Sequence, residues 1–167
     1  MRPRGSLAIV IAGLAGAWCA ADFPRGPFPA GGSTAAGGAQ QGCAPTAADM
    51  EGPFYKADAP ERASIGRGLV VSGGVRTAGS CAPVPKARIE WWQVNPQGHY
   101  DDAHRATQMA DAEGRYRFET ESPVGYFGRP PHIHVKVLAP GHATLTTQIY
   151  PRGGQTEIAF DFVLRPH

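Results

Sequence analysis

Glycine and proline interrupt this chain at short intervals, and that spacing limits what the chain can fold into. The 167 residues include 22 glycines and 16 prolines. Between them lie short runs rich in Val, Ile, Phe and Tyr, residue types that favour β-strands. Helices would need longer uninterrupted runs than these. The pattern therefore predicts an all-β domain, an antiparallel β-sandwich.

Six segments have the composition and alternation expected of strands. They are residues 66–76, 87–94, 115–120, 132–138, 144–150 and 157–164. The polar stretch 100–112 has no such pattern, and we expect it to form a loop over the functional site. Helix is expected at most as one turn, at 46–50.

The first 21 residues are typical of a secretory signal peptide. Arg2 and Arg4 supply the positive start, and an apolar stretch runs from Ser6 to Trp18. That stretch is shorter than the roughly 20 residues needed to cross a bilayer. Two alternatives are an uncleaved anchor and a lipoprotein signal on Cys19. The bulky Trp18 before that cysteine disfavours the lipoprotein.

Residues 22–42 are rich in Gly, Ala and Pro and predict a flexible tether, because they cannot bury enough apolar surface to order. Residues 43–167 then form one domain with one core. We expect a periplasmic or secreted protein with no stable membrane association after signal cleavage. A net charge of +2 does not suggest a nucleic-acid partner. The sequence leaves homo-oligomerisation open.

Cysteine usage agrees with export. Once Cys19 leaves with the signal, only Cys43 and Cys81 remain, an even number in an oxidising compartment. We therefore expect a disulfide between them. The alternative is two buried thiols.

Two histidines mark the segment at 132–138 as a candidate metal site. On a strand His132 and His134 point to the same face, side by side. The prolines at 130 and 131 make the preceding backbone stiff and extended. One more ligand from an aromatic-rich loop would complete a metal site, whereas alone the pair could be two polar residues on a half-exposed face. The opposite face, which should pack into the core, carries Ile133, Val135 and Val137.

Five motifs, in order, resemble those of the intradiol ring-cleavage dioxygenases, the non-haem ferric enzymes that cut catechols. The most specific is Pro-x-x-Tyr-x-x-Arg-x-x-His-x-His, from Pro123 to His134. The others are Glu-Gly-Pro-aromatic, Trp-Gln-x-x-x-x-Gly-x-Tyr, Asp-x-x-Gly-x-Tyr-x-Phe and Thr-Gln-x-Tyr, at residues 51–55, 92–100, 111–118 and 147–150. The resemblance covers about residues 43–162.

The resemblance implies a β-sandwich of immunoglobulin-like or transthyretin-like topology that binds Fe(III). It implies a hydroxide as a further ligand, and protein ligands at Tyr100, Tyr126, His132 and His134. Two phenolates and two imidazoles suit Fe(III) better than Fe(II). A catechol would displace Tyr126 and the hydroxide, which take up its protons. O₂ would then open the ring between the two hydroxyl-bearing carbons, giving a cis,cis-muconate.

Supporting roles follow from the same resemblance. Arg129 would stabilise negative charge on the ring, although a surface arginine paired with a carboxylate is the simpler alternative. Gln148 resembles a glutamine near the family's site, and a plain strand glutamine explains it almost as well. Phe54 and Tyr55 line the pocket or simply pack in the core. Four further histidines are expected to face solvent: His99, His104, His142 and His167.

The chain also departs from the family. We expect it to lack the helical dimerisation segment of the well-known catechol enzymes, and the link from Tyr126 to Arg129 is short. The substrate therefore does not transfer from the resemblance. A second interpretation is an exported transthyretin-like or carboxypeptidase-regulatory-like binding module without metal, and a third is a cupin-type metal protein. Neither needs Tyr126, Arg129 and the two histidines together.

Overall fold

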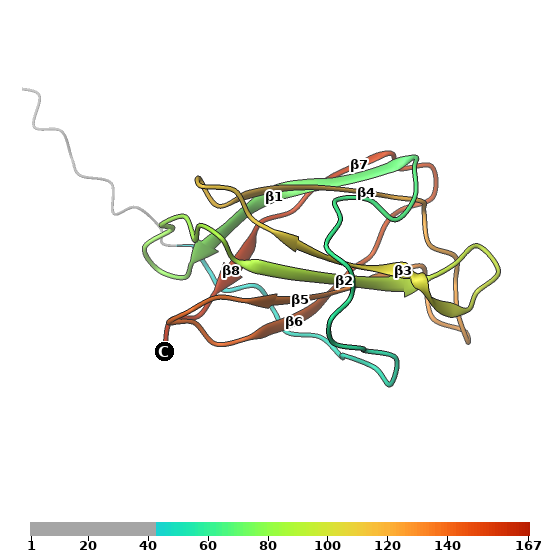
Figure 1. The fold of residues 1–167 in the computed structure, drawn as a ribbon, viewed down its shortest axis with the longest axis horizontal. Coiled ribbons are helices and arrows are strands. Elements are labelled where there is room, and N and C mark those ends of the chain that lie inside the picture. Colours follow the sequence, from blue (N-terminus) through green and yellow to red (C-terminus); the bar gives the residue numbers. More distant parts are fainter. Residues whose placement is uncertain (1–42) are drawn as a thin grey trace, which may run out of the picture. The chain divides into compact units, whose positions relative to one another are not determined.

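The computed structural model describes residues 43–167, which form a two-layered β-sandwich (Figure 1). The expected signal peptide (1–21) and tether (22–42) lie outside the described residues. Within 43–167 there is no helix, and hence none long and apolar enough to cross a membrane. The eight strands are β1 Leu69–Thr77, β2 Arg88–Val94, β3 Tyr100–Met109, β4 Arg115–Thr120, β5 Ile133–Leu138, β6 Leu145–Ile149, β7 Glu157–Ala159 and β8 Phe162–Leu164.

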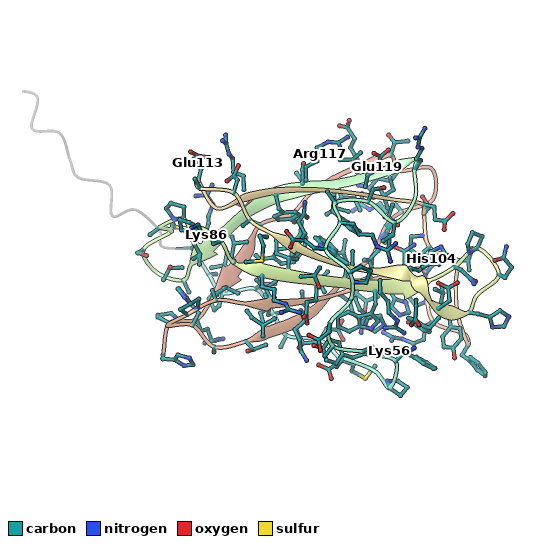
Figure 2. All side chains as sticks on the ribbon, viewed as in Figure 1. Lys56, Lys86, His104, Glu113, Arg117 and Glu119 are labelled. Atoms are coloured by element: carbon teal, nitrogen blue, oxygen red, sulfur yellow. A yellow bond between two sulfur atoms is a disulfide. The ribbon has the colours of Figure 1, made fainter. Side chains whose placement is uncertain are left out.

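The strands form two sheets, as predicted for a sandwich. One sheet has the order β4-β1-β7, with β8 also paired to β1, and the other has the order β3-β2-β5-β6. Pairing is antiparallel except between β1 and the two short strands β7 and β8. The outer side of the first sheet is polar, and Figure 2 shows the labelled Arg117 and Glu119 there, away from the second sheet.

The core lies between the two sheets and is centred on Trp91 of β2. Its indole stacks on Phe118 of β4, with ring centroids 4.3 Å apart and planes 3° from parallel. Offset stacking of this kind adds about 0.5–1.5 kcal/mol beyond the area that it buries. The face of β5 expected to be apolar packs here, with Ile133, Val135 and Val137 fully buried. This packing leaves the opposite face of β5, with its histidines, free to build a site.

The prediction of a loop at 100–112 is wrong, because most of these residues form β3. This strand pairs with β2 at Tyr100 and again from Arg105 to Met109, with a register shift between Trp92 and Val94. Its buried positions include the polar residues Arg105 and Thr107, whose partners come from residues 54–62. The backbone N–H of Thr107 donates to Pro60, and Arg105 donates to the carbonyl of Phe54. The strand has no apolar alternation because its buried face is largely polar.

The single strand expected at 157–164 is two strands, β7 and β8. The pairing with β1 is interrupted at Phe160, whose carbonyl accepts a hydrogen bond of 2.6 Å from the Tyr116 hydroxyl. This carbonyl lies against Gly73, where an added Cβ would lie 1.9 Å from the oxygen. Only glycine fits this contact. The register with β1 is the same on both sides of the interruption, so the alternation of Ile158, Phe160 and Phe162 continues through it.

An extended stretch before β1, residues 43–65, connects the two edges of the second sheet; we call it the crossing segment. At one edge the Asp49 N–H donates to Thr146 of β6, and at the other the Arg62 N–H donates to Thr107 of β3. Figure 1 shows it in cyan to green, passing across β2. The outer face of this sheet is therefore covered by chain, which supplies one wall of the site.

A disulfide joins Cys43 to Cys81 across a sequence separation of 38, as expected. It ties the start of the crossing segment to the turn that follows β1. The backbone N–H of Gly79 also donates to the Cys43 carbonyl in the same turn. The disulfide thus anchors the start of the crossing segment, and later residues of the same segment reach the site.

We expect the double variant Cys43→Ser/Cys81→Ser to lose about 4 kcal/mol of unfolding free energy. The reason is that a crosslink of this loop length lowers the entropy of the unfolded chain. Urea unfolding measures the loss, and a reducing agent should bring the wild type to the same midpoint. An unchanged midpoint in the double variant would contradict the expectation.

Candidate metal centre

Three donor atoms converge on the outer face of the second sheet. The hydroxyl oxygen of Tyr100 lies 2.9 Å from Nε2 of His134 and 3.4 Å from Nε2 of His132. The two Nε2 atoms are 3.2 Å apart. Both histidines are only 2% exposed. We call these three side chains the donor cluster.

The sheet register brings the donor cluster together. Tyr100 opens β3 opposite Val94, and His134 on β5 is opposite Trp92, so β2 holds both from either side. The register shifts between these two positions of β2, because residues 101–104 of β3 lie opposite the single residue Gln93. His132 lies just before β5 and two residues from His134, on the same face as predicted. Residues from two strands separated by β2 therefore meet at one point.

The tautomer of His132 suits a metal ligand. Its Nδ1 lies 2.7 Å from the carbonyl of Pro130. A carbonyl can only accept, so Nδ1 carries the proton and the Nε2 lone pair faces the cluster. Burial lowers the pKa of His132, and burial together with His132 and Arg129 lowers the pKa of His134 to about 4. Both rings are therefore neutral near pH 7.

These donors fit a bound cation. Ligands about 2.0–2.1 Å from one ion lie roughly 3 Å from each other, which is the spacing found here. The two buried Nε2 atoms and the Tyr100 hydroxyl face one point, so a single ion could bind all three. Among residues 43–167 no group of three or more His, Cys, Asp or Glu could hold a metal. A site here therefore depends on tyrosine oxygen, a hard donor that favours a ferric ion.

Tyr126 stands beside the cluster and lines the hollow above it. Its ring meets that of Tyr100 edge-on, with centroids 5.5 Å apart. Among the described residues its hydroxyl has no hydrogen-bond partner, whereas the Tyr100 hydroxyl touches both histidines. The structure thus brings three of the four expected ligands into contact and leaves Tyr126 adjacent to them.

Arg129 also lines the hollow and is held from behind. Its Nη2 donates to Oε1 of Gln148 at 2.8 Å and to the Tyr150 hydroxyl at 3.3 Å. Tyr150 donates in turn to the carboxylate of Asp49 at 2.7 Å. The guanidinium therefore faces the site with its position fixed, and Gln148 contacts it directly.

Asp49 and Tyr150 are site residues that the sequence analysis missed. A signal for Tyr150 was present, because positions 148 and 150 share one face of an extended chain. Asp49 had none, since it lies 101 residues before Tyr150 in the chain.

Phe54 and Tyr55 have separate positions. Phe54 lines the hollow and stacks on Tyr100, with centroids 4.4 Å apart. Tyr55 does not line it, which corrects the expected pocket role. Its ring packs 5.2 Å from that of Trp92, and its hydroxyl donates to buried Glu90 at 2.7 Å. Phe54 lies in the turn at residues 53–54 and Tyr55 just after it, and the two rings lie against different neighbours.

Trp92 is a second residue whose place the sequence did not reveal. Its indole stacks on the His134 ring, with centroids 4.9 Å apart and planes 6° from parallel. The chain also comes close to His134 at Gly52, where an added Cβ would lie 3.4 Å from the ring. Gly52 has a φ of +70°, which favours glycine. An indole and a backbone turn thus both pack against the imidazole.

One of the four histidines expected in solvent is largely buried. Nδ1 of His104 lies 2.6 Å from Asp101, and its Nε2 lies 2.5 Å from Glu121, beyond the end of β4. Its side chain is 13% exposed. Figure 2 shows His104 near the end of β3 where Tyr100 lies. The prediction missed this because Glu121 lies beyond another strand, and because Asp101, three residues away on β3, lies in a stretch that was expected to be a loop.

We expect the free energy of unfolding to fall above pH 10, partly because of Tyr55. Burial and the bond to Glu90 raise the pKa of Tyr55 to about 12. Between pH 10 and 12 the unfolded phenol ionises and the folded one does not, so alkali favours unfolding by about 1–2 kcal/mol. Urea unfolding from pH 8 to 12 measures this slope, and Tyr55→Phe should flatten it. Equal slopes for the two proteins would contradict it.

The hollow above the donor cluster has a volume of about 440 Å³. Its walls are mainly apolar and aromatic, and Arg129 is its only residue with a fixed charge. It is lined by Met50, Gly52, Pro53, Phe54, Tyr100, Tyr126, Phe127, Arg129, His132 and His134. A small planar molecule in it would touch the donor cluster and the arginine together.

Comparison with known proteins identifies the family. The family model described as "Dioxygenase" matches residues 45–165. The chain belongs to the intradiol ring-cleavage dioxygenase family, so the resemblance seen in the motifs is confirmed.

Individual relatives agree with this assignment. The dioxygenase domain of a dioxygenase carbohydrate-binding protein fusion from the cellulolytic bacterium Streptomyces sp. SirexAA-E is 35% identical. It has a TM-score of 0.67 and covers 74% of this chain and 100% of its own. A catechol 1,2-dioxygenase from Pseudomonas sp. (strain EST1001) is 36% identical over 60% of this chain and 45% of its own length. A hydroxyquinol 1,2-dioxygenase from Rhodococcus opacus is 35% identical over 65% and 47%. This chain thus spans about half the length of these two curated relatives.

Proposed function

We propose that this protein is a non-haem Fe(III) dioxygenase. It would cleave a catechol between its two hydroxyl-bearing carbons with O₂ and release a cis,cis-muconate. The convergence of Tyr100, His132 and His134 on one point supports this most directly. Membership of the dioxygenase family supports the reaction class.

The ligands of the iron would be the donor cluster and Tyr126. Ferric iron, when bound, would supply the Lewis acidity that prepares the catechol for reaction with O₂. A bound ferric ion would remove the proton of the Tyr126 phenol. The resulting phenolate oxygen has no protein partner among residues 43–167, so it is the group that we assign to take a proton from the incoming catechol. Tyr100 touches both histidines and is the tyrosine that we assign to remain in place.

Arg129 would act on charge that develops on the ring. A guanidinium keeps its positive charge through the reaction and does not offer a labile proton. Its bonds to Gln148 and Tyr150 hold it in position before substrate arrives. Such preorganised charge in a site shielded from water is an effective way to lower a barrier. Gln148 would act by positioning Arg129.

We further propose that the protein is exported and works in the periplasm or outside the cell. The signal-like residues 1–21 motivate this, and the Cys43–Cys81 disulfide supports it, since disulfides persist mainly in oxidising compartments. Non-reduced peptide mapping of periplasmic or secreted material should show the linked pair. Two free thiols in that material would contradict the proposal.

Product analysis tests the reaction. The purified protein, loaded with iron, is given catechol, protocatechuate and hydroxyquinol in turn under O₂. A muconate from any of them supports intradiol cleavage, and a yellow semialdehyde would mean extradiol cleavage and reject it. Colour separates the alternatives, because tyrosinate bound to Fe(III) is red to burgundy. A metal-free binding module would be colourless and would consume no O₂.

A further inference from the structure

An aromatic wall connects the donor cluster to the rim of the hollow. Phe54 stacks on Tyr100 and meets Tyr126 edge-on, with centroids 5.9 Å apart. Tyr126 meets Phe127 edge-on at 4.7 Å. A flat ligand whose reactive end lies at the cluster would therefore have aromatic contact along its whole length.

Phe127, at the outer end of this wall, is unusual in two ways. It is 89% exposed, the largest exposed fraction among the large hydrophobic residues of 43–167 that lie at the surface. It also has a φ of +46°, in the left-handed region that bulky residues avoid at a cost of about 1–2 kcal/mol. A smaller polar residue or glycine would serve this turn better. Neither packing nor turn formation explains a phenylalanine here.

The turn that carries Phe127 is well defined. The N–H of Tyr126 donates to Arg129 at 3.2 Å, and the N–H of Arg129 donates back to Tyr126 at 2.9 Å. Gly128 completes the two-residue turn with a φ of +74°. The exposed ring is thus presented from a closed hairpin, directly between Tyr126 and Arg129 in the chain.

The other features of the rim point to an uncharged aromatic ligand. Met50, 61% exposed, is part of the same lining, and methionine sulfur packs well on aromatic rings. Among the residues that line the hollow Arg129 carries the one fixed charge, and Met50, Pro53 and Phe127 bring no charge to the rim. The hollow, about 440 Å³, falls within the range of roughly 300–1,000 Å³ that holds drug-sized ligands. A single catechol ring would leave much of it empty.

We propose that Met50, Pro53 and Phe127 form a subsite for an uncharged aromatic group attached to the catechol. The preferred substrates would then be aryl-substituted catechols, ahead of catechol itself and of carboxylated catechols. This inference rests on the proposed function, which accounts for the reaction of the catechol ring at the donor cluster. The subsite itself lies at the rim of the hollow and is not needed for binding the metal.

The test compares three substrates in the iron-loaded protein: 4-phenylcatechol, catechol and protocatechuate. We expect kcat/KM for 4-phenylcatechol to exceed that for catechol by about tenfold, the size of one good aromatic contact plus its buried area. Phe127→Ala should lower that ratio about tenfold, and Phe127→Trp should keep it. Met109→Ala is the matched control, since Met109 is an exposed residue of β3 outside the hollow. It should leave the ratio unchanged.

A binding measurement keeps the inference separate from the reaction. Biphenyl-4-ol has one hydroxyl and is not a catechol, so its affinity for the metal-free protein, measured by calorimetry, reports the rim alone. It should bind more tightly than phenol, and Phe127→Ala should remove most of the difference.

The outcomes distinguish the two proposals. The subsite is overturned if the protein cleaves catechols but the ratio of kcat/KM for 4-phenylcatechol to that for catechol is near one and Phe127→Ala does not change it. The proposed function would then still stand. Preference for protocatechuate over 4-phenylcatechol also overturns the subsite. If none of the three is cleaved, the proposed function fails. Binding of biphenyl-4-ol that depends on Phe127 then still supports the subsite, and equal binding of biphenyl-4-ol and phenol rejects it.

Discussion

Replacing His134 by alanine is expected to abolish iron binding. His134 is 2% exposed, and its Nε2 lies within 3.2 Å of both other members of the donor cluster. Loss of an outer-shell partner alone weakens metal binding about 10–100-fold, so loss of a ligand should exceed about 100-fold. Metal analysis and the visible charge-transfer band measure it. The variant should be colourless.

The control for this variant is His142→Ala. His142 is half-buried and bonded to Thr77 at 2.9 Å, so its removal also deletes a structural imidazole contact. It should keep iron and colour. His134→Gln preserves more volume and guards against misfolding, which circular dichroism checks. Undiminished iron in folded His134 variants, or stoichiometric zinc in the wild type, would reject the ligand set.

Replacing Arg129 by alanine is expected to preserve colour and remove most turnover. The guanidinium lines the hollow but does not contact the donor atoms, so iron should still bind. Loss of one preorganised charge-stabilising group costs about 10²–10³-fold in kcat. Steady-state O₂ uptake and iron content are measured on the same samples.

Two further variants make the Arg129 result specific. Arg152→Ala removes an exposed arginine outside the hollow and should keep full activity. Tyr150→Phe keeps Arg129 but removes the hydroxyl that accepts a hydrogen bond from Arg129 and donates one to Asp49. We expect it to lower kcat less than Arg129→Ala. Full activity in Arg129→Ala would return that residue to a structural role.

Much of the fold follows from local pattern. The strands β1, β2, β4, β5 and β6 lie where alternation predicts them, because each packs one apolar face on the core. The prediction failed where burial is polar, as at Arg105 and Thr107 of β3. It also failed at Phe160, where a close approach to Gly73 of β1 interrupts the strand pairing.

The site divides in the same way. His132 and His134 are two residues apart, so strand geometry alone places them together. The roles of Tyr100 and Arg129 came from the family resemblance. The contacts of Tyr100 depend on the register of β2 with β3 and β5, and those of Arg129 depend on Gln148 of β6 and on Tyr150. The roles of Asp49, Trp92 and His104 rest on contacts between distant segments. No spacing in one sequence shows those contacts.

The crossing segment has a consequence for how the protein behaves at high concentration. An uncovered edge strand offers free N–H and C=O groups to a second molecule, which is a common start of aggregation. Here the outer strand β6 is bonded to Asp49 and the outer strand β3 to Pro60 and Arg62. The crossing segment, which forms one wall of the hollow, therefore also hinders the edge strands of this sheet from pairing with those of a second molecule. A substitution that loosened it would be expected to make the protein polymerise as well as to deform the site.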